Sequence, residues 1–296
     1  MDSPHGAAVT AEDFGLKGPR GWAFRGVRLD APPGALVAIE GPSGSGRTCL
    51  LLALTGRMRP AEGRAEVGGL RLPRQMAAVR RISSLGPVPG VSELDPAFTV
   101  AEHLHERALL QRRFDGSLRT LLRPRAERAA TSRARIDAAL DAAGLGLADL
   151  PKAGRTSVRD LERLEALRLS VALALVGRPW LLAVDDADLK LSDTERAEAW
   201  ELLRSVAAGG TTVLAVCSQA PDHAITVRMD GTESKAGAGG TGSTRAESTL
   251  GTAEAAHTAT AEAAEATAAR KTTGTTTQKS TTEKGTADAI AETGRA

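Results

Sequence analysis

The sequence has 296 residues, of which 42% are apolar, 25% are charged and only 2% are aromatic. This length suits one or two domains, and because Tyr is absent the core must be built mainly from Ala, Leu and Val. The formal net charge of +2 provides no argument for nucleic-acid binding, so no nucleic-acid partner is expected. Cys49 and Cys217 lie in apolar runs, which indicates a reducing compartment and no disulfide framework.

The N-terminal residues do not resemble a signal peptide. Residues 1–12 lack both a basic n-region and an apolar h-region. No run reaches the roughly 18 apolar residues that a membrane helix needs. The best candidate, 166–184, is broken by Arg168 and by Gly177-Arg178-Pro179. The sequence therefore predicts a soluble chain, or one that a partner holds at a membrane.

Short apolar runs alternate along the chain with longer helical patterns. Strands are predicted over 35–39, 80–85, 180–184 and 212–217, and helices over 49–54, 101–122, 126–143, 161–176 and 194–207. Strands that alternate with helices favour an α/β fold with a mainly parallel sheet covered on both faces. The helical block over about 98–165 interrupts this alternation, so we interpret it as an inserted helical subdomain.

The composition changes after Asp230. Residues 231–296 are mostly Thr, Ala, Gly, Glu and Ser, with no Phe, Trp or Tyr. Such a segment cannot bury enough apolar surface to offset its chain entropy, so we expect a disordered tail. With residues 1–13 taken as an N-terminal extension, the folded domain is predicted to run from 14 to 230.

The strongest motif is the glycine-rich run Gly41-Pro42-Ser43-Gly44-Ser45-Gly46-Arg47-Thr48. It lies between a predicted strand and a predicted helix. Glycines at this spacing let backbone N–H groups converge on phosphate oxygens, and the hydroxyl of Thr48 suits Mg²⁺. The run therefore predicts binding of a nucleoside triphosphate, with ATP and Mg²⁺ as ligands.

Arg47 stands where such loops usually carry Lys. Its guanidinium is planar and forked, whereas Lys carries a compact charge. We expect nucleotide binding to survive this exchange better than hydrolysis. Asp185, which ends the buried run 180–184, is the second candidate magnesium ligand. The structural alternative is that Asp185 only caps the next turn.

A locally basic region follows the predicted start of the helical subdomain. Nine arginines are concentrated between 107 and 135, namely Arg107, Arg112, Arg113, Arg119, Arg123, Arg125, Arg128, Arg133 and Arg135. A solvated helical face is the simple interpretation. Contact with a partner or with lipid head groups is the alternative.

Several phrases together resemble the ATP-binding subunit of ABC transporters over about residues 14–220. They are 26–30 with Pro33-Gly34, 41–48 with 54–56, 99–104, and 172–179 before Asp185. The resemblance implies a P-loop NTPase core of ABC type that works as a dimer of ATP-binding domains on a membrane permease. It also implies a cytoplasmic location, peripheral at the inner face of the cell membrane. One similar subgroup accompanies membrane proteins of the phage-infection-protein type.

The catalytic motifs of that family are matched less well. Pro87 occupies the region of the family's Q-loop glutamine, and only Leu161 matches the signature Leu-Ser-Gly-Gly-Gln over 161–165. Glu162 would bring a negative charge towards a phosphate held by the opposite subunit. The family's switch His should fall near Ser218-Gln219, and neither of these residues is His.

Two further assignments follow from the resemblance. Asp186 takes the place of the family's catalytic Glu, which makes it the candidate general base. Trp22 is the candidate for stacking on adenine, with packing at a strand start as the alternative. Two functions stay open: an ATPase motor subunit, and a non-hydrolysing nucleotide-binding subunit with a regulatory or structural role. A small-molecule kinase is weaker, because no second substrate-binding motif stands out.

Overall fold

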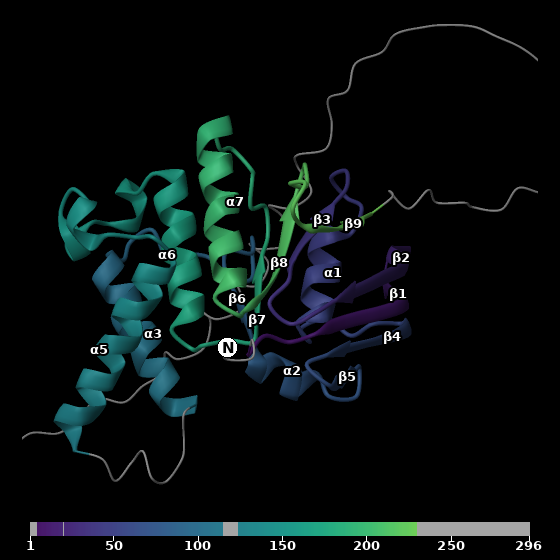
Figure 1. Ribbon diagram of the computed structural model, residues 1–296, viewed down its shortest axis with the longest axis horizontal. Coiled ribbons are helices and arrows are strands. Elements are labelled where there is room, and N and C mark those ends of the chain that lie inside the picture. Colours follow the sequence, from purple (N-terminus) through teal and green to yellow (C-terminus); the bar gives the residue numbers. More distant parts are fainter. Residues whose placement is uncertain (1–4, 20, 115–123, 230–296) are drawn as a thin grey trace, which may run out of the picture. The chain divides into compact units, whose positions relative to one another are not determined.

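The computed structural model describes residues 5–19, 21–114 and 124–229 (Figure 1). Its central feature is a five-stranded sheet with the strand order β6-β7-β8-β3-β9. The strands are β3 (Leu36–Glu40), β6 (Ser83–Leu85), β7 (Leu181–Val184), β8 (Thr212–Cys217) and β9 (Ile225–Arg228). All neighbouring pairs are parallel, so the carboxyl ends of the strands meet at one edge. The predicted parallel sheet is thereby confirmed.

Residues in the parallel strands alternate between two cores, because successive side chains point to opposite faces. Val37 and Ile39 join the core that contains α1 (Arg47–Leu54). Leu36 and Ala38 join the core that contains α6 (Arg163–Leu175) and α7 (Asp193–Ala208). Figure 1 shows α1 on one side of the sheet and α6 and α7 on the other.

A second sheet, which the sequence analysis did not predict, packs in the same core as α1. It is antiparallel, with the order β2-β1-β4-β5. Its strands are β1 (Val9–Gly18), β2 (Gly21–Ala31), β4 (Glu62–Val67) and β5 (Leu70–Leu72). The register of β1 against β2 shifts between Ala11 and Phe14 and again between Phe14 and Leu16. These irregularities break the apolar alternation by which a strand is detected.

Two helices of the expected helical subdomain pack beside α6. They are α3 (Val100–Phe114) and α5 (Arg125–Ala142), and their buried residues include Leu104 and Leu140. Between them, residues 115–123 lie outside the described residues, as does the predicted tail over 231–296. Among the helices that the structure describes, none is long and apolar enough to span a bilayer.

The predicted strand over 80–85 is wrong in its first half. Helix α2 (Met76–Ile82) occupies those positions, and only Ser83–Leu85 forms β6. Val79 is fully buried in the core that contains α1, which gives this helix its anchor. At the other end of the chain, β1 begins at Val9, inside the segment that we predicted as an extension. The domain boundaries stay predictions.

Candidate functional site

The glycine-rich loop lies between the carboxyl end of β3 and the first turn of α1. Gly44 and Gly46 have φ of +82° and +87°, a region that glycine enters without strain. A Cβ at position 46 would lie 2.1 Å from the backbone oxygen of Ala23. Residue 46 must therefore be glycine because of both its backbone conformation and its contact with β2.

The positive N-terminal end of α1 is not neutralised by any side chain of its own first turn or cap. Its N-cap is Gly46, no side chain caps it, and its first turn contains no acidic residue. The partial positive charge of a helix N-terminus is therefore left for an external group. Within the loop, Ser45 Oγ is buried and has no hydrogen-bond partner among the described residues. An unpartnered polar atom in this position fits a loop that receives oxyanion ligands.

Two carboxylates lie beside the loop, just beyond β7. Thr48 Oγ1 donates a hydrogen bond of 2.7 Å to Asp185 Oδ2, and the Asp186 N–H donates one of 3.0 Å to Asp185 Oδ1. Asp185 is buried, and burial raises its carboxyl pKa above the usual value, with a further rise from the charge of Asp186. The hydrogen bond from Thr48 opposes this rise. The structure thus brings together the two oxygen ligands that the sequence predicted for Mg²⁺.

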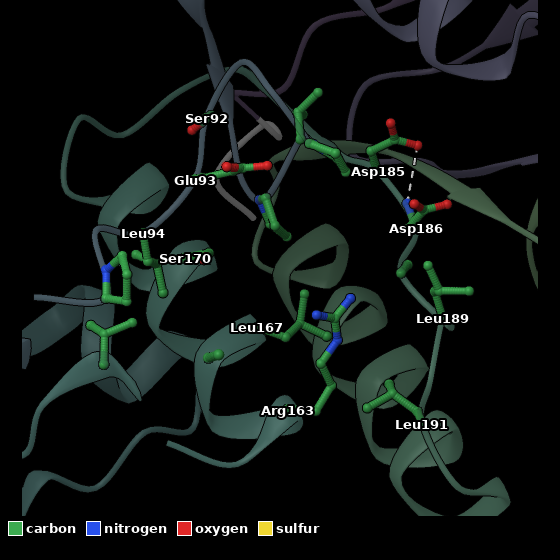
Figure 2. Close-up of a pocket in the computed structure, with 17 residues that line it drawn as sticks. Ser92, Glu93, Leu94, Arg163, Leu167, Ser170, Asp185, Asp186, Leu189 and Leu191 are labelled. Carbon is green, nitrogen blue, oxygen red and sulfur yellow. Dashed lines mark hydrogen bonds between the residues drawn. The ribbon is translucent and has the colours of Figure 1, made fainter. Parts of the chain in front are cut away.

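Asp186 has φ of +48°, in the left-handed region that non-glycine residues rarely adopt. Together with Leu189 it lines two clefts. One, of about 690 Å³, also contains Gly41, Pro42, Ser43 and Arg47. The other, of about 420 Å³, lies on the α6 side and is lined by Asp185 as well (Figure 2). Asp186 therefore borders both the cleft at the phosphate loop and the second cleft.

Arg47 extends from the first position of α1 to the adjacent strand. Its Nη1 donates a hydrogen bond of 2.6 Å to the backbone oxygen of Cys217, the last residue of β8. Arg47 also lines the loop cleft, and its guanidinium has further N–H donors beyond the one that bonds Cys217. Cys217 is buried, and burial together with nearby carboxylates raises its thiol pKa to about 12.

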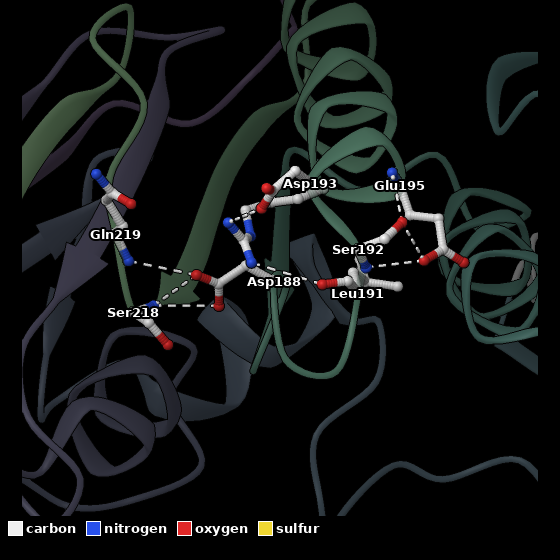
Figure 3. Close-up of polar contacts among 8 residues, drawn as sticks. Asp188, Leu191, Ser192, Asp193, Glu195, Ser218 and Gln219 are labelled. Carbon is white, nitrogen blue, oxygen red and sulfur yellow. Dashed lines mark hydrogen bonds and ion pairs between the residues drawn. The ribbon is translucent and has the colours of Figure 1, made fainter.

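Asp188, which the sequence analysis did not identify, connects the segment after β7 to the segment after β8. Its buried carboxylate accepts hydrogen bonds from the backbone N–H of Ser218, at 2.8 and 3.1 Å, and of Gln219, at 3.3 Å (Figure 3). It thereby fixes the segment after β8, where Ser218 lines the loop cleft. The sequence signal that could have identified Asp188 is its place as a third acid, two residues after Asp186.

Trp22 lies at the start of β2, next to the residue that contacts Gly46. It is half-buried, with the Arg25 guanidinium 4.7 Å and the Lys17 amine 5.8 Å from its ring. An adenine ring that stacks on Trp22 would therefore compete with a cation for the indole face. Its role as the stacking residue stays a prediction.

Helix α6 begins with a capping box formed by two acids. Glu162 is the N-cap residue, and its backbone N–H donates a hydrogen bond of 2.9 Å to Glu165 Oε2. Glu162 in turn accepts from the backbone of Glu165. The positive end of this helix is thus already matched by carboxylates of the same chain, unlike that of α1.

Comparisons with family models and with curated proteins identify the same family. Residues 24–188 match the family model described as ABC transporter. A daunorubicin resistance ATP-binding protein of Streptomyces coeruleorubidus is 34% identical over 193 residues, which cover 65% of this chain and 54% of the relative. A Nod factor export ATP-binding protein of Cupriavidus pinatubonensis is 30% identical over 210 residues, covering 71% and 54%. The chain thus spans about half the length of these curated relatives.

Solved structures agree on the fold. A bacterial ABC transporter cassette solved as a dimer has a TM-score of 0.58 at 20% identity, covering 76% of this chain and 97% of that one. A post-hydrolysis dimer of an ATP-binding cassette with ADP and Pi has a TM-score of 0.54 at 21% identity, covering 71% and 88%.

Proposed function

Because this chain belongs to the ABC transporter family, as an ATP-binding subunit, we propose that it binds Mg-ATP and hydrolyses it to drive a membrane partner. The observation that carries the proposal is the hydrogen bond between Thr48 and Asp185, beside a phosphate loop with an uncapped helix start. Neutral hydroxyl and anionic carboxylate oxygens are the donors that Mg²⁺ prefers. Their pairing supports a magnesium site formed by these two residues.

In this proposal the loop residues 41–48 hold the phosphates. Backbone N–H groups of the loop and the start of α1 bind phosphate oxygens, and Arg47 neutralises charge from the side of β8. Mg²⁺ would neutralise phosphate charge at Thr48 and Asp185. Trp22 is the proposed contact for adenine, which would displace Lys17 or Arg25 from the indole ring.

Asp186 is the proposed general base. It accepts a proton from the attacking water while the water oxygen bonds to the γ-phosphorus and the bond to the β–γ bridging oxygen breaks, which leaves ADP and phosphate. Its position between two clefts supports this role, because water and phosphate can reach one carboxylate from different sides. Its left-handed backbone is the kind of strain found at functional sites.

We propose that ATP turnover is slow, because this chain departs from several of the family's catalytic motifs. Pro87 stands where the family has its Q-loop glutamine, and Ser218 and Gln219 stand where it has its switch His, so we propose that neither motif supports fast turnover in this chain. The acidic cap of α6 would repel a phosphate brought to it by a second ATP-binding domain. We therefore propose that this chain pairs best with a cassette whose equivalent helix start is uncharged.

Partner and location are proposed from family membership. An ATP-binding subunit that drives a permease would lie at the inner face of the cell membrane through that permease. On the resemblance of the sequence alone, we propose a partner of the phage-infection-protein type. Co-purification of the full chain from membranes of its source cells tests this, and recovery of the chain with no membrane protein contradicts it.

The central experiment measures ATP binding by calorimetry and phosphate release by the full chain, with Asp186→Asn as the test variant. Loss of the base should lower phosphate release by roughly a hundredfold or more while binding changes little. Asp30→Asn, which changes an exposed acid on β2, serves as the control. Phosphate release that is no higher in the natural chain than in Asp186→Asn would establish the non-hydrolysing alternative. Absence of ATP binding would refute both.

A further inference from the structure

Two cations lie against the indole ring of Trp22, the proposed contact for the nucleotide base. The guanidinium carbon of Arg25 is 4.7 Å and the amine of Lys17 is 5.8 Å from the ring centroid. Lys17 is the cross-strand partner of Trp22 in the pairing of β1 with β2. Ala23, the next residue along β2, approaches Gly46 of the phosphate loop with its backbone oxygen. A nucleotide whose phosphates lie in the loop can therefore bring its base to these side chains.

Arg25 is held at the indole by an acid on β4. Its Nε donates a hydrogen bond of 2.5 Å to Glu62 Oε1, and its Nη2 donates one of 3.1 Å to Glu62 Oε2. Glu62 pairs with Gly15 on β1, where a Cβ would lie 2.8 Å from Glu62 Cγ. The missing side chain at position 15 thus leaves room for this carboxylate. Within the described residues, Arg25 Nη1 has no hydrogen bond, so its donors are left for a ligand.

The carboxylates near the indole already have partners. Both oxygens of Glu62 accept from Arg25. Asp13, which lines the same shallow cleft as Arg25 and Glu62, accepts a hydrogen bond of 3.1 Å from Arg28 Nη2. Lys17, by contrast, has no acidic partner in the part of the chain that the structure describes. The free hydrogen-bonding capacity at the ring therefore comes mainly from N–H donors.

Purine bases differ at the edge that such donors would meet. Guanine and hypoxanthine present two acceptors, O6 and N7, whereas adenine presents N7 beside the N6 amino group, which is a donor. Lys and Arg side chains only donate, so they form paired hydrogen bonds with a 6-oxopurine, while the amino group of adenine meets another donor. A base stacked on the indole lies beside these cations or displaces them to its rim. In both cases their N–H groups border its edge.

We propose that Lys17 and Arg25 determine base specificity at Trp22, so that this chain binds the 6-oxopurine triphosphates GTP and ITP more tightly than ATP. The inference rests on the proposed nucleotide site and specifies which base that site prefers. Lys17 supplies an ammonium without an acidic partner, and Arg25 supplies a donor that Glu62 fixes in place. The phosphates and Mg²⁺ are the same in all three nucleotides, so a difference in affinity reports on the base.

The test measures binding of ATP, GTP and ITP to the full chain by calorimetry with Mg²⁺ present. GTP and ITP should bind about fivefold more tightly than ATP or better, as expected for one matched pair of hydrogen bonds to a base. In the double variant Lys17→Met, Arg25→Met the three affinities should become equal, because the donors are lost while the apolar stems remain. Both side chains are exposed, so the variant should fold.

A second double variant provides the matched control. Arg64→Met, Arg71→Met also removes two exposed positive charges, from arginines that pair with acids elsewhere in the same sheet. It should keep the preference for GTP and ITP. Loss of the preference in this variant as well would overturn the proposal, because net charge and not the two side chains at Trp22 would then be responsible.

The nucleotides themselves separate the remaining outcomes. Equal binding of ATP and GTP by the natural chain, or a preference that persists in Lys17→Met, Arg25→Met, would overturn the proposal. Tight binding of GTP with ITP no tighter than ATP would also overturn it, since the 2-amino group of guanine would then be the group recognised. All these outcomes include ATP binding, so they leave the proposed nucleotide site standing. Absence of binding by all three nucleotides would refute that site and this inference together.

Discussion

Arg47 Nη1 and the backbone oxygen of Cys217 are 2.6 Å apart, so the only cation of the phosphate loop is hydrogen-bonded to the end of β8. A neutral carbonyl is a weaker partner for guanidinium than a phosphate oxygen is. Nucleotide can therefore compete for this side chain. The contact also connects the loop to the segment that Asp188 fixes.

The first prediction concerns this contact. Arg47→Ala should weaken Mg-ATP binding by about tenfold or more, since hydrogen bonds to charged groups contribute about 1.5–3 kcal/mol. Arg47→Lys keeps the charge but loses the forked reach to β8, so binding should change little and phosphate release should rise. Calorimetry and phosphate-release assays measure the two effects. Unchanged binding in Arg47→Ala would contradict the role proposed for this side chain.

The second prediction concerns Asp188. Asp188→Ala removes a buried acceptor of two backbone N–H groups, so the free energy of unfolding should fall by about 1.5–3 kcal/mol. Asp188→Asn keeps one acceptor oxygen and should lose less. Denaturant unfolding provides the measurement. Asp30→Ala, an exposed acid on β2, should stay within about 0.5 kcal/mol of the natural chain. An equal loss in both alanine variants would argue against a specific role for Asp188.

The third prediction uses two glycines of the loop. Gly44→Ala should cost about 1–2 kcal/mol for its left-handed backbone alone, because its Cβ would meet open space. Gly46→Ala has the same backbone cost and in addition a backbone oxygen 2.1 Å from the new Cβ. It should therefore unfold at clearly lower denaturant concentration than Gly44→Ala. Equal midpoints would mean that β2 can move away from the loop without penalty.

The fold and site differ in how much of them the sequence predicts. The strands that were predicted, such as 212–217, are continuous apolar runs buried on both faces. Such a run can be recognised in the sequence without knowing which strands lie beside it. The loop at 41–48 was found because its chemistry needs glycines at fixed spacing. Strand β1 was missed because its register shifts near Phe14 break the two-residue period.

Tertiary contacts explain the other omissions. Asp188 has a role only because β7 and β8 are neighbours in the sheet, which brings Ser218 to its carboxylate. The basic region around Arg107 was visible as composition, but only the fold brings its charge close to that of Arg57, which follows α1, and of Arg80, which belongs to α2. Such pairings depend on the arrangement of strands and helices, and local sequence patterns do not contain that information.

The fourth prediction is a pH dependence. The thiol pKa of Cys217 is about 12 in the folded chain against a usual value of 9.0, because its thiolate would be buried near carboxylates. As the pH rises, the unfolded chain therefore loses the Cys217 proton before the folded chain does. The contribution of the protonated Cys217 thiol to the free energy of unfolding is fully present below about pH 9. It is lost as the pH rises towards 12, by about 1.4 kcal/mol per pH unit.

Comparison of Cys217→Ala with the natural chain isolates this contribution. The difference in unfolding free energy between the two should be constant up to about pH 9 and should narrow above it. Iodoacetamide should modify Cys49 before Cys217 at pH 8, since only Cys49 is partly exposed. Early modification of Cys217 would show that the end of β8 opens in solution.

The scarcity of aromatic side chains has a spectroscopic consequence. With no Tyr in the chain, near-ultraviolet emission comes from Trp22, Trp180 and Trp200. Their surroundings differ: Trp200 is 7% exposed on α7, Trp180 is 44% exposed, and Trp22 is half-buried beside the residue that contacts Gly46. A change in emission on nucleotide addition that disappears in Trp22→Phe can therefore be assigned to one indole. The chain thus carries its own optical reporter of the phosphate loop, and needs no attached dye.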